Sequence, residues 1–211
     1  MPDDTPLKAF ALNCSLRPSS SDRPSSTDKM IADLLAAMAP HGVTGTTERV
    51  ADFDVKPGVL SDMGEGDAWP ALRKRVLEAD IFILGTPIWL GHPSSLARRV
   101  LERMDAFLSE MDDQSRMPPT GKVALVAVVG NEDGAHASHA TCFQALNDVG
   151  FTIPANSGVY WVGEAMQGKD YVDVETIPEP LELMLSTAAS NAAHLARLLK
   201  AQSYPGLPDG D

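Results

Sequence analysis

A loop rich in hydroxyl groups is the first place where this chain could do chemistry. Residues 12–27 read LNCSLRPSSSDRPSST, between a short apolar run and an amphipathic helical pattern. The N-terminus of a helix presents unpaired N–H groups and the positive end of a dipole, which suits an anion such as phosphate. Serine and threonine hydroxyls add donors without adding charge. An ordinary helix cap formed by one of the last three residues is the other interpretation.

Two more loops are expected beside the first. Residues 85–95 read GTPIWLGHPSS after a buried apolar run, and residues 130–134 read GNEDG after another. The glycines and prolines of the earlier loop predict a tight turn whose exposed N–H groups can bind the polar edge of a flat aromatic ligand. The glycines of the later loop permit close approach of backbone to ligand. A packed turn and a solvated turn remain the respective alternatives.

The elements that position these loops alternate between strand-like and helical patterns. Strands are predicted at Lys8–Cys14, Gly45–Val50, Ile81–Leu84, Val123–Val129 and Gly158–Val162. Helices are predicted at Met30–Met38, Trp69–Glu78, Leu96–Met111, His139–Val149 and Pro180–Lys200. Such alternation predicts a three-layer α/β fold with a five-stranded parallel sheet and helices on both faces. The flavodoxin-like strand order 2-1-3-4-5 is favoured, because the competing dinucleotide fold needs glycines that the first loop lacks.

Composition limits the classes of function. The 211 residues carry a formal net charge of −12, which disfavours binding to nucleic acid or to anionic membranes. There is no apolar run of about 20 residues and no apolar core of a signal peptide, so we expect a cytoplasmic protein without membrane insertion. One domain is expected over residues 1–211, with a core of about 7–200 and a mobile tail at 203–211. Cys14 and Cys142 are expected to be buried and reduced.

The three loops together resemble those of the NADPH-dependent FMN reductase branch of the flavodoxin-like superfamily. The first loop is similar to that family's G-S-x-R…S-N-T phosphate motif, with Cys14 in place of a glycine, Ser26 in place of an asparagine, and a long insertion. The resemblance covers most of residues 8–165. It implies that the following residues bind the cofactor: Ser15, Arg17, Ser25, Ser26, Thr27, Pro87, Ile88, Trp89, Leu90, Gly91, Gly130, Asn131, Glu132, Asp133 and Gly134.

The resemblance implies an oxidoreductase whose chemistry is carried by FMN, without a catalytic side chain or a metal. NAD(P)H would be the reductant, and a quinone, a flavin or another small molecule the acceptor. A homodimer is implied, and exposed apolar side chains at Trp89, Leu90 and Trp161 would favour association. An electron carrier that lacks NAD(P)H reductase activity is the alternative, since strong acidity suits docking on basic partners. A chain that has lost its cofactor is a third reading.

Other chemistries lack their motifs. A tyrosine phosphatase of related fold needs C-x5-R, but Ser20 stands where the arginine would follow Cys14. His136 and His139 lack the companion ligands of a zinc site and are expected as polar surface near the loops. Core packing is the favoured role for Tyr160 and Trp161, and stacking near a bound ring is the alternative.

Overall fold

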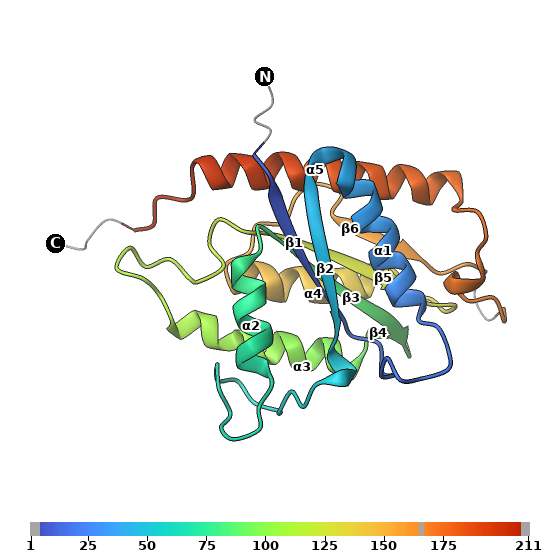
Figure 1. Cartoon of the computed structure of the whole chain (residues 1–211), viewed down its shortest axis with the longest axis horizontal. Helices are drawn as coiled ribbons and strands as arrows, with labels where there is room; N and C mark the ends of the chain where they lie inside the picture. The colour runs from blue at the N-terminus through green and yellow to red at the C-terminus, as the bar shows by residue number, and fades with distance from the viewer. Residues whose placement is uncertain (1–4, 165–166, 208–211) are drawn as a thin grey trace.

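The computed structural model describes residues 5–164 and 167–207, and its centre is a sheet of five parallel strands (Figure 1). The strands are β1 (Leu7–Asn13), β2 (Val43–Arg49), β3 (Ile81–Trp89), β5 (Val123–Val129) and β6 (Gly158–Trp161). Their order is β2-β1-β3-β5-β6, and the two-residue strand β4 (His92–Pro93) pairs antiparallel with the end of β3. Counted along the parallel strands alone, the predicted order 2-1-3-4-5 is confirmed.

Helices cover both faces of this sheet, as predicted. Side chains from α1 (Ser26–Met38) and α5 (Glu179–Ala201) pack on one face. Those from α2 (Trp69–Glu78), α3 (Ser95–Met104) and α4 (Ala135–Asp148) pack on the other. Successive residues of a strand point to opposite faces, so both faces of a parallel sheet must be apolar. In β1, Ala11 therefore joins the α1 and α5 layer, whereas Leu12 joins the other.

Several predicted boundaries were wrong; α1, for example, starts at Ser26 and not at Met30. The helix after β3 ends at Met104 and continues as a 3-10 turn over Asp105–Ser109, so Met111 lies outside it and is exposed. Residues three apart also share a face in a 3-10 turn, which is why the apolar spacing suggested one long helix. Strand β3 continues through the predicted loop as far as Trp89, because Gly85–Pro87 pairs with Ala127–Val129. Helix α4 starts four residues earlier than predicted, at Ala135.

A buried ion pair fastens the long loop that follows β2. The Arg103 guanidinium on α3 donates to Asp67 at 2.7 Å, and both side chains are fully buried. Arg103 also donates to the carbonyl oxygens of Leu60 and Lys56, each at 2.9 Å. Burial raises the pKa of Asp67, but the bond from Arg103 and three backbone amides together hold this pKa well below its usual range. The loop is therefore anchored through a permanently charged pair.

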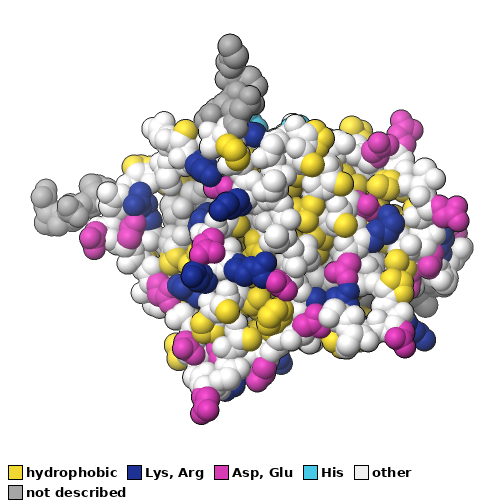
Figure 2. Space-filling model, viewed as in Figure 1, with side chains coloured by type: hydrophobic (Ala, Val, Ile, Leu, Met, Phe, Trp, Pro, Cys, Tyr) yellow, Lys and Arg dark blue, Asp and Glu magenta, His cyan; other side chains and the backbone are white. Residues whose placement is uncertain are grey.

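Charged side chains of both signs share the surface, and the described part of the C-terminal tail packs on the rest of the chain. Basic and acidic side chains lie side by side on the face shown in Figure 2. Ion pairs join Arg75 to Glu48 and Arg73 to Glu110. Of the tail predicted to be mobile, the described part packs on the body: the amide of Leu207 donates to the Gln114 carbonyl at 2.9 Å. Residues 208–211 lie outside the described part.

Within the described ranges, no helix has both the length and the apolar character to span a membrane.

Candidate functional site

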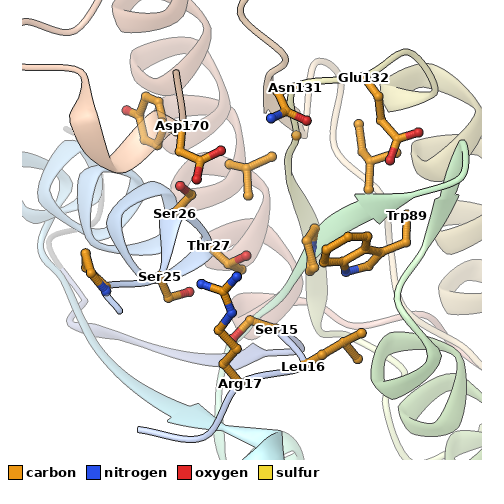
Figure 3. Close-up of a pocket in the computed structure, with 16 residues that line it drawn as sticks. Ser15, Leu16, Arg17, Ser25, Ser26, Thr27, Trp89, Asn131, Glu132 and Asp170 are labelled. Atoms are coloured by element: carbon orange, nitrogen blue, oxygen red, sulfur yellow. The ribbon is translucent and has the colours of Figure 1, made fainter. Parts of the chain in front are cut away.

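A cleft of about 360 Å³ opens at the carboxyl edge of the sheet, where open α/β sheets bind their ligands (Figure 3). The loop after β1 forms one wall, the end of β3 a second, and the end of β5 with the loop after it a third; Asp170 and Tyr171, which follow β6, form a fourth. The lining residues are Ser15, Leu16, Arg17, Pro24, Ser25, Ser26, Thr27, Pro87, Ile88, Trp89, Val129, Gly130, Asn131, Glu132, Asp170 and Tyr171.

One end of the cleft is the N-terminus of α1. Ser25 is its N-cap, since its hydroxyl oxygen accepts from the Asp28 amide at 3.2 Å. The Ser26 hydroxyl oxygen accepts from the Val172 amide at 3.1 Å. Because both oxygens act as acceptors, each hydroxyl proton stays free to donate toward the cleft. The first amides of a helix also lack partners inside the helix. Ser25 thus caps the helix and lines the cleft, so the two interpretations of this loop are compatible.

Ser15 adds a buried donor at the same end. Its side-chain oxygen has no hydrogen-bond partner among the described residues, although the residue is only 8% exposed. A buried hydroxyl without a partner is uncommon and costs free energy. In Figure 3 the exposed side chain of Arg17 points toward Thr27, across the floor of this end. An unpaired hydroxyl, a helix N-terminus and a guanidinium together fit an oxyanion such as phosphate.

Two side chains that the sequence did not single out hold this end together. Asn13 is fully buried at the end of β1; its amide group accepts from the Ser15 N–H at 2.8 Å and donates to the Ser25 hydroxyl at 3.3 Å. Arg49, at the end of β2, pairs with Asp28 and donates to the Pro18 carbonyl at 2.9 Å. A polar residue at the end of an apolar strand was the available signal for Asn13. No sequence pattern marked Arg49.

The other end of the cleft is apolar and flat. Trp89 lies across the cleft from Arg17 and Thr27, with Leu16 on the same side (Figure 3). Ile88 and Val129 are buried beneath it, whereas Trp89 is 52% exposed. Asn131 and Glu132 lie at its rim. An anion-binding end joined to a flat apolar end suits a ligand that carries a phosphate and an aromatic ring.

The structure brings together most, not all, of the predicted site. Leu90, Gly91, Asp133 and Gly134 do not line the cleft. The reason lies in Gly134, whose φ is +119° and whose missing Cβ would lie 2.7 Å from the Cα of Gly91. This glycine therefore allows the loop after β5 to touch the β3–β4 turn, and its approach to a ligand stays a prediction.

The fourth wall was missed by the sequence analysis. Asp170 and Tyr171 lie beyond β6 in the chain, and Tyr171 packs against α1. The Tyr171 hydroxyl donates to Asp33 at 2.6 Å, and the Lys29 ammonium lies 4.4 Å from the centre of its ring. Burial and this hydrogen bond raise the pKa of Tyr171 well above its ordinary value. Tyr171 is therefore a neutral donor that keeps the wall against the helix start.

Other expected residues lie elsewhere. Cys14 and Cys142 are buried and free, as predicted, and burial raises the pKa of the Cys14 thiol, which favours its neutral form. Trp161 is half-buried against the core and 5.5 Å from the Tyr171 ring, so it does not form an exposed patch with Trp89. His139 was expected at the surface but is buried, which lowers its pKa to about 4.

Comparison with known proteins agrees with this geometry. Residues 7–167 match the NADPH-dependent FMN reductase family. The 8-demethyl-8-aminoriboflavin-5′-phosphate synthase of Streptomyces davaonensis is 31% identical over 208 residues, which cover 94% of this chain and 80% of that protein. The crystal structure of RosB with bound 8-demethyl-8-formylriboflavin-5′-phosphate has a TM-score of 0.84 at 31% identity, covering 94% of this chain and 82% of that one.

A second relative is much longer than this chain. The divalent metal cation transporter MntH of Mycobacterium bovis is 36% identical over 202 residues, which are 92% of this chain. The chain spans only 29% of that transporter's length. The family match covers most of this chain, and the similarity to the synthase covers 94% of this chain. This chain belongs to the NADPH-dependent FMN reductase family.

Proposed function

We propose that this chain is an FMN-dependent oxidoreductase that transfers electrons from NAD(P)H to a quinone, a flavin or another small acceptor. The observation that carries the proposal is the unpaired, buried hydroxyl of Ser15 beside the N-terminus of α1. A phosphate at this place would supply the missing acceptor. The residues present therefore fit FMN, and FAD is disfavoured because the first loop lacks the glycines that suit a pyrophosphate.

Each end of the cleft has its own task in this mechanism. The hydroxyls of Ser15, Ser25 and Thr27, with Arg17, bind and orient the phosphate. Trp89, with the buried side chains of Ile88 and Val129, would exclude water from the apolar end of the cleft. Bound FMN would supply the site that accepts a hydride, so the protein needs no general acid or base there. Backbone amides of the cleft lining would stabilise negative charge that develops on the cofactor, as preorganised dipoles do in other sites.

The test begins with the absorption spectrum of the protein after saturation with FMN and removal of unbound flavin. We expect flavin absorbance in the visible range that bleaches when NADPH or NADH is added without oxygen. Mass analysis of the released cofactor should give FMN. Release of FAD, or no retained flavin after saturation, would refute the cofactor assignment. Retained FMN that neither nucleotide bleaches would instead support the electron carrier.

A second candidate follows from similarity to the synthase. The synthase of Streptomyces davaonensis is 31% identical over 94% of this chain. The RosB structure, which resembles this chain, holds 8-demethyl-8-formylriboflavin-5′-phosphate. The flavin could accordingly be a substrate here and not a permanent cofactor. Incubation with FMN, a reductant, oxygen and an amine donor, followed by mass analysis of the flavin, separates the two candidates, since an amino group on the ring needs a source of nitrogen. An unchanged flavin mass after many turnovers supports the reductase.

We further propose that the chain acts in the cytoplasm as a homodimer whose flavin mouth is completed by the partner subunit. Trp89 is 52% exposed beside the cleft and Leu90 is 89% exposed next to it, which supports association at this edge. Trp161 no longer contributes to this argument. Sedimentation of the FMN-bound protein at micromolar concentration is the test. A monomer that still turns over would refute the shared mouth.

A further inference from the structure

The tip of the β3–β4 hairpin has a residue that suits neither its conformation nor its surroundings. Trp89 pairs with His92, so Leu90 and Gly91 form a two-residue turn with φ of 52° and 78°. Turns with two positive φ values favour Asn-Gly or Asp-Gly, because a branched apolar side chain is strained there. Leu90 is also 89% exposed, so burial does not compensate for the strain. Something outside the turn must hold it.

The neighbouring loop supplies that hold. The Leu90 amide donates to a carboxylate oxygen of Glu132 at 3.1 Å, across 42 residues of sequence. Beside this bond, the Gly91 backbone packs where a Cβ of Gly134 would stand. The next residue, Asp133, is engaged elsewhere, since it accepts from the Gly134 amide at 2.7 Å. Glu132 is thus the carboxylate that ties the turn to the loop after β5.

This turn adjoins Trp89, the wall at the flat end of the cleft. Glu132 and Trp89 both line the cleft. Leu90, which follows Trp89 in the chain and bonds to Glu132, does not. Figure 3 shows the Glu132 carboxylate and the Trp89 indole on the same side of the cleft. If the Leu90 amide loses its acceptor, the strained turn can relax, and Trp89 moves with it because the two residues are adjacent.

We propose that Glu132 is a positioning residue, whose carboxylate holds the β3–β4 turn in its strained conformation and so keeps Trp89 over the flavin ring. The inference rests on the proposed binding of FMN in this cleft. Two opposed contributions set the position of the wall: the strain at Leu90, which favours release, and the hydrogen bond from Leu90 to Glu132, which opposes it.

The experiment titrates FMN into the purified flavin-free protein and follows the quenching of flavin fluorescence. Loss of this exposed hydrogen bond in Glu132→Ala should raise the Kd for FMN about three- to tenfold. Glu132→Gln keeps an acceptor oxygen and should bind within about twofold of the wild type, a difference below 0.5 kcal/mol. Both substitutions remove the negative charge of Glu132, and this removal by itself would favour binding of a phosphate. The glutamine variant therefore separates the effect of the charge from the effect of the hydrogen bond.

A second substitution tests the strain. Asparagine tolerates the left-handed conformation, so Leu90→Asn should restore FMN binding when it is combined with Glu132→Ala. Leu90 is exposed, so this substitution does not threaten the core. Quenching of protein fluorescence at saturating FMN reports on Trp89 when it is compared with Trp89→Phe. We expect weaker quenching in Glu132→Ala and recovery in the double variant.

The outcomes separate this inference from the proposed function. Tight FMN binding by the wild type with an unchanged Kd in Glu132→Ala overturns the positioning role alone. So does a Glu132→Gln variant that binds as weakly as the alanine variant, or a double variant that is not restored. A wild-type protein that does not bind FMN overturns the proposed function, and this inference with it.

Discussion

Replacing Ser15 by alanine should make the flavin-free protein more stable and its binding of FMN weaker. In the flavin-free protein the Ser15 hydroxyl is buried without a hydrogen-bond partner among the described residues. A buried hydroxyl of this kind lowers the free energy of unfolding by about 1–3 kcal/mol, compared with a hydrogen-bonded hydroxyl or no hydroxyl at all. Removing it should therefore raise the free energy of unfolding by about 1 kcal/mol. For a chain of this size, that corresponds to an increase in Tm of about 2–4 °C.

The effect on binding has the opposite sign. A hydrogen bond from a hydroxyl to a charged phosphate contributes about 1.5–3 kcal/mol, so its loss raises the Kd for FMN about tenfold to a hundredfold. Thermal unfolding without FMN and a fluorescence titration with FMN measure the two quantities separately. Riboflavin, which lacks the phosphate, should bind equally well to the wild type and to Ser15→Ala.

A matched control exists in the core. The Ser138 hydroxyl on α4 is also buried without a partner among the described residues, but it does not line the cleft. Ser138→Ala should therefore leave the Kd for FMN unchanged. It should also leave Tm the same or raise it. A lower Tm for Ser15→Ala without flavin would show that the hydroxyl has a structural partner, and an unchanged Kd would show that the phosphate binds elsewhere. Either result would refute the reasoning.

Three more predictions concern the helix start, the buried ion pair and the buried histidine. Thr27→Val should weaken FMN binding by about 1.5–3 kcal/mol, and Ser20→Ala should not, because Thr27 lines the cleft and Ser20 is exposed outside it; equal Kd values in titrations of both variants would be contrary evidence. Asp67→Asn should lower the free energy of unfolding by about 3–5 kcal/mol by leaving Arg103 buried and unpaired. Because the folded pKa of Asp67 is depressed, its contribution is complete above its unfolded pKa and lost as pH falls below it, which urea unfolding at several pH values would detect. Burial lowers the pKa of His139 from 6.5 to about 4. Between these pH values the unfolded chain binds a proton at this histidine and the folded chain does not, so the free energy of unfolding should fall as pH drops from 6.5 to about 4. His139→Asn should flatten that part of the stability profile, and an unchanged slope would contradict the assignment.

The order of the elements could be predicted because it depends on local pattern. Val123–Val129 is apolar at every position, and this alone predicts a strand covered on both faces. The hydroxyl loop before α1 also has a local meaning, since serine caps a helix wherever one begins. Helix and strand ends were less certain, because an apolar spacing of three fits both the α-helix to Met104 and the 3-10 turn beyond it.

The composition of the site was decided by contacts between distant segments. Residue types and order along the chain sufficed to place Ser15, Thr27, Trp89 and Asn131 near one edge of a sheet. They could not show that Asp170 lines the cleft, since Asp170 is remote in sequence from the other lining residues and no residue pattern links it to them. Nor could they show which hydroxyls already have partners: the Ser26 hydroxyl accepts from the Val172 amide, whereas the Ser15 hydroxyl is left unpaired. Hydrogen-bond satisfaction depends on the distance between groups remote in sequence, and only the folded chain sets those distances.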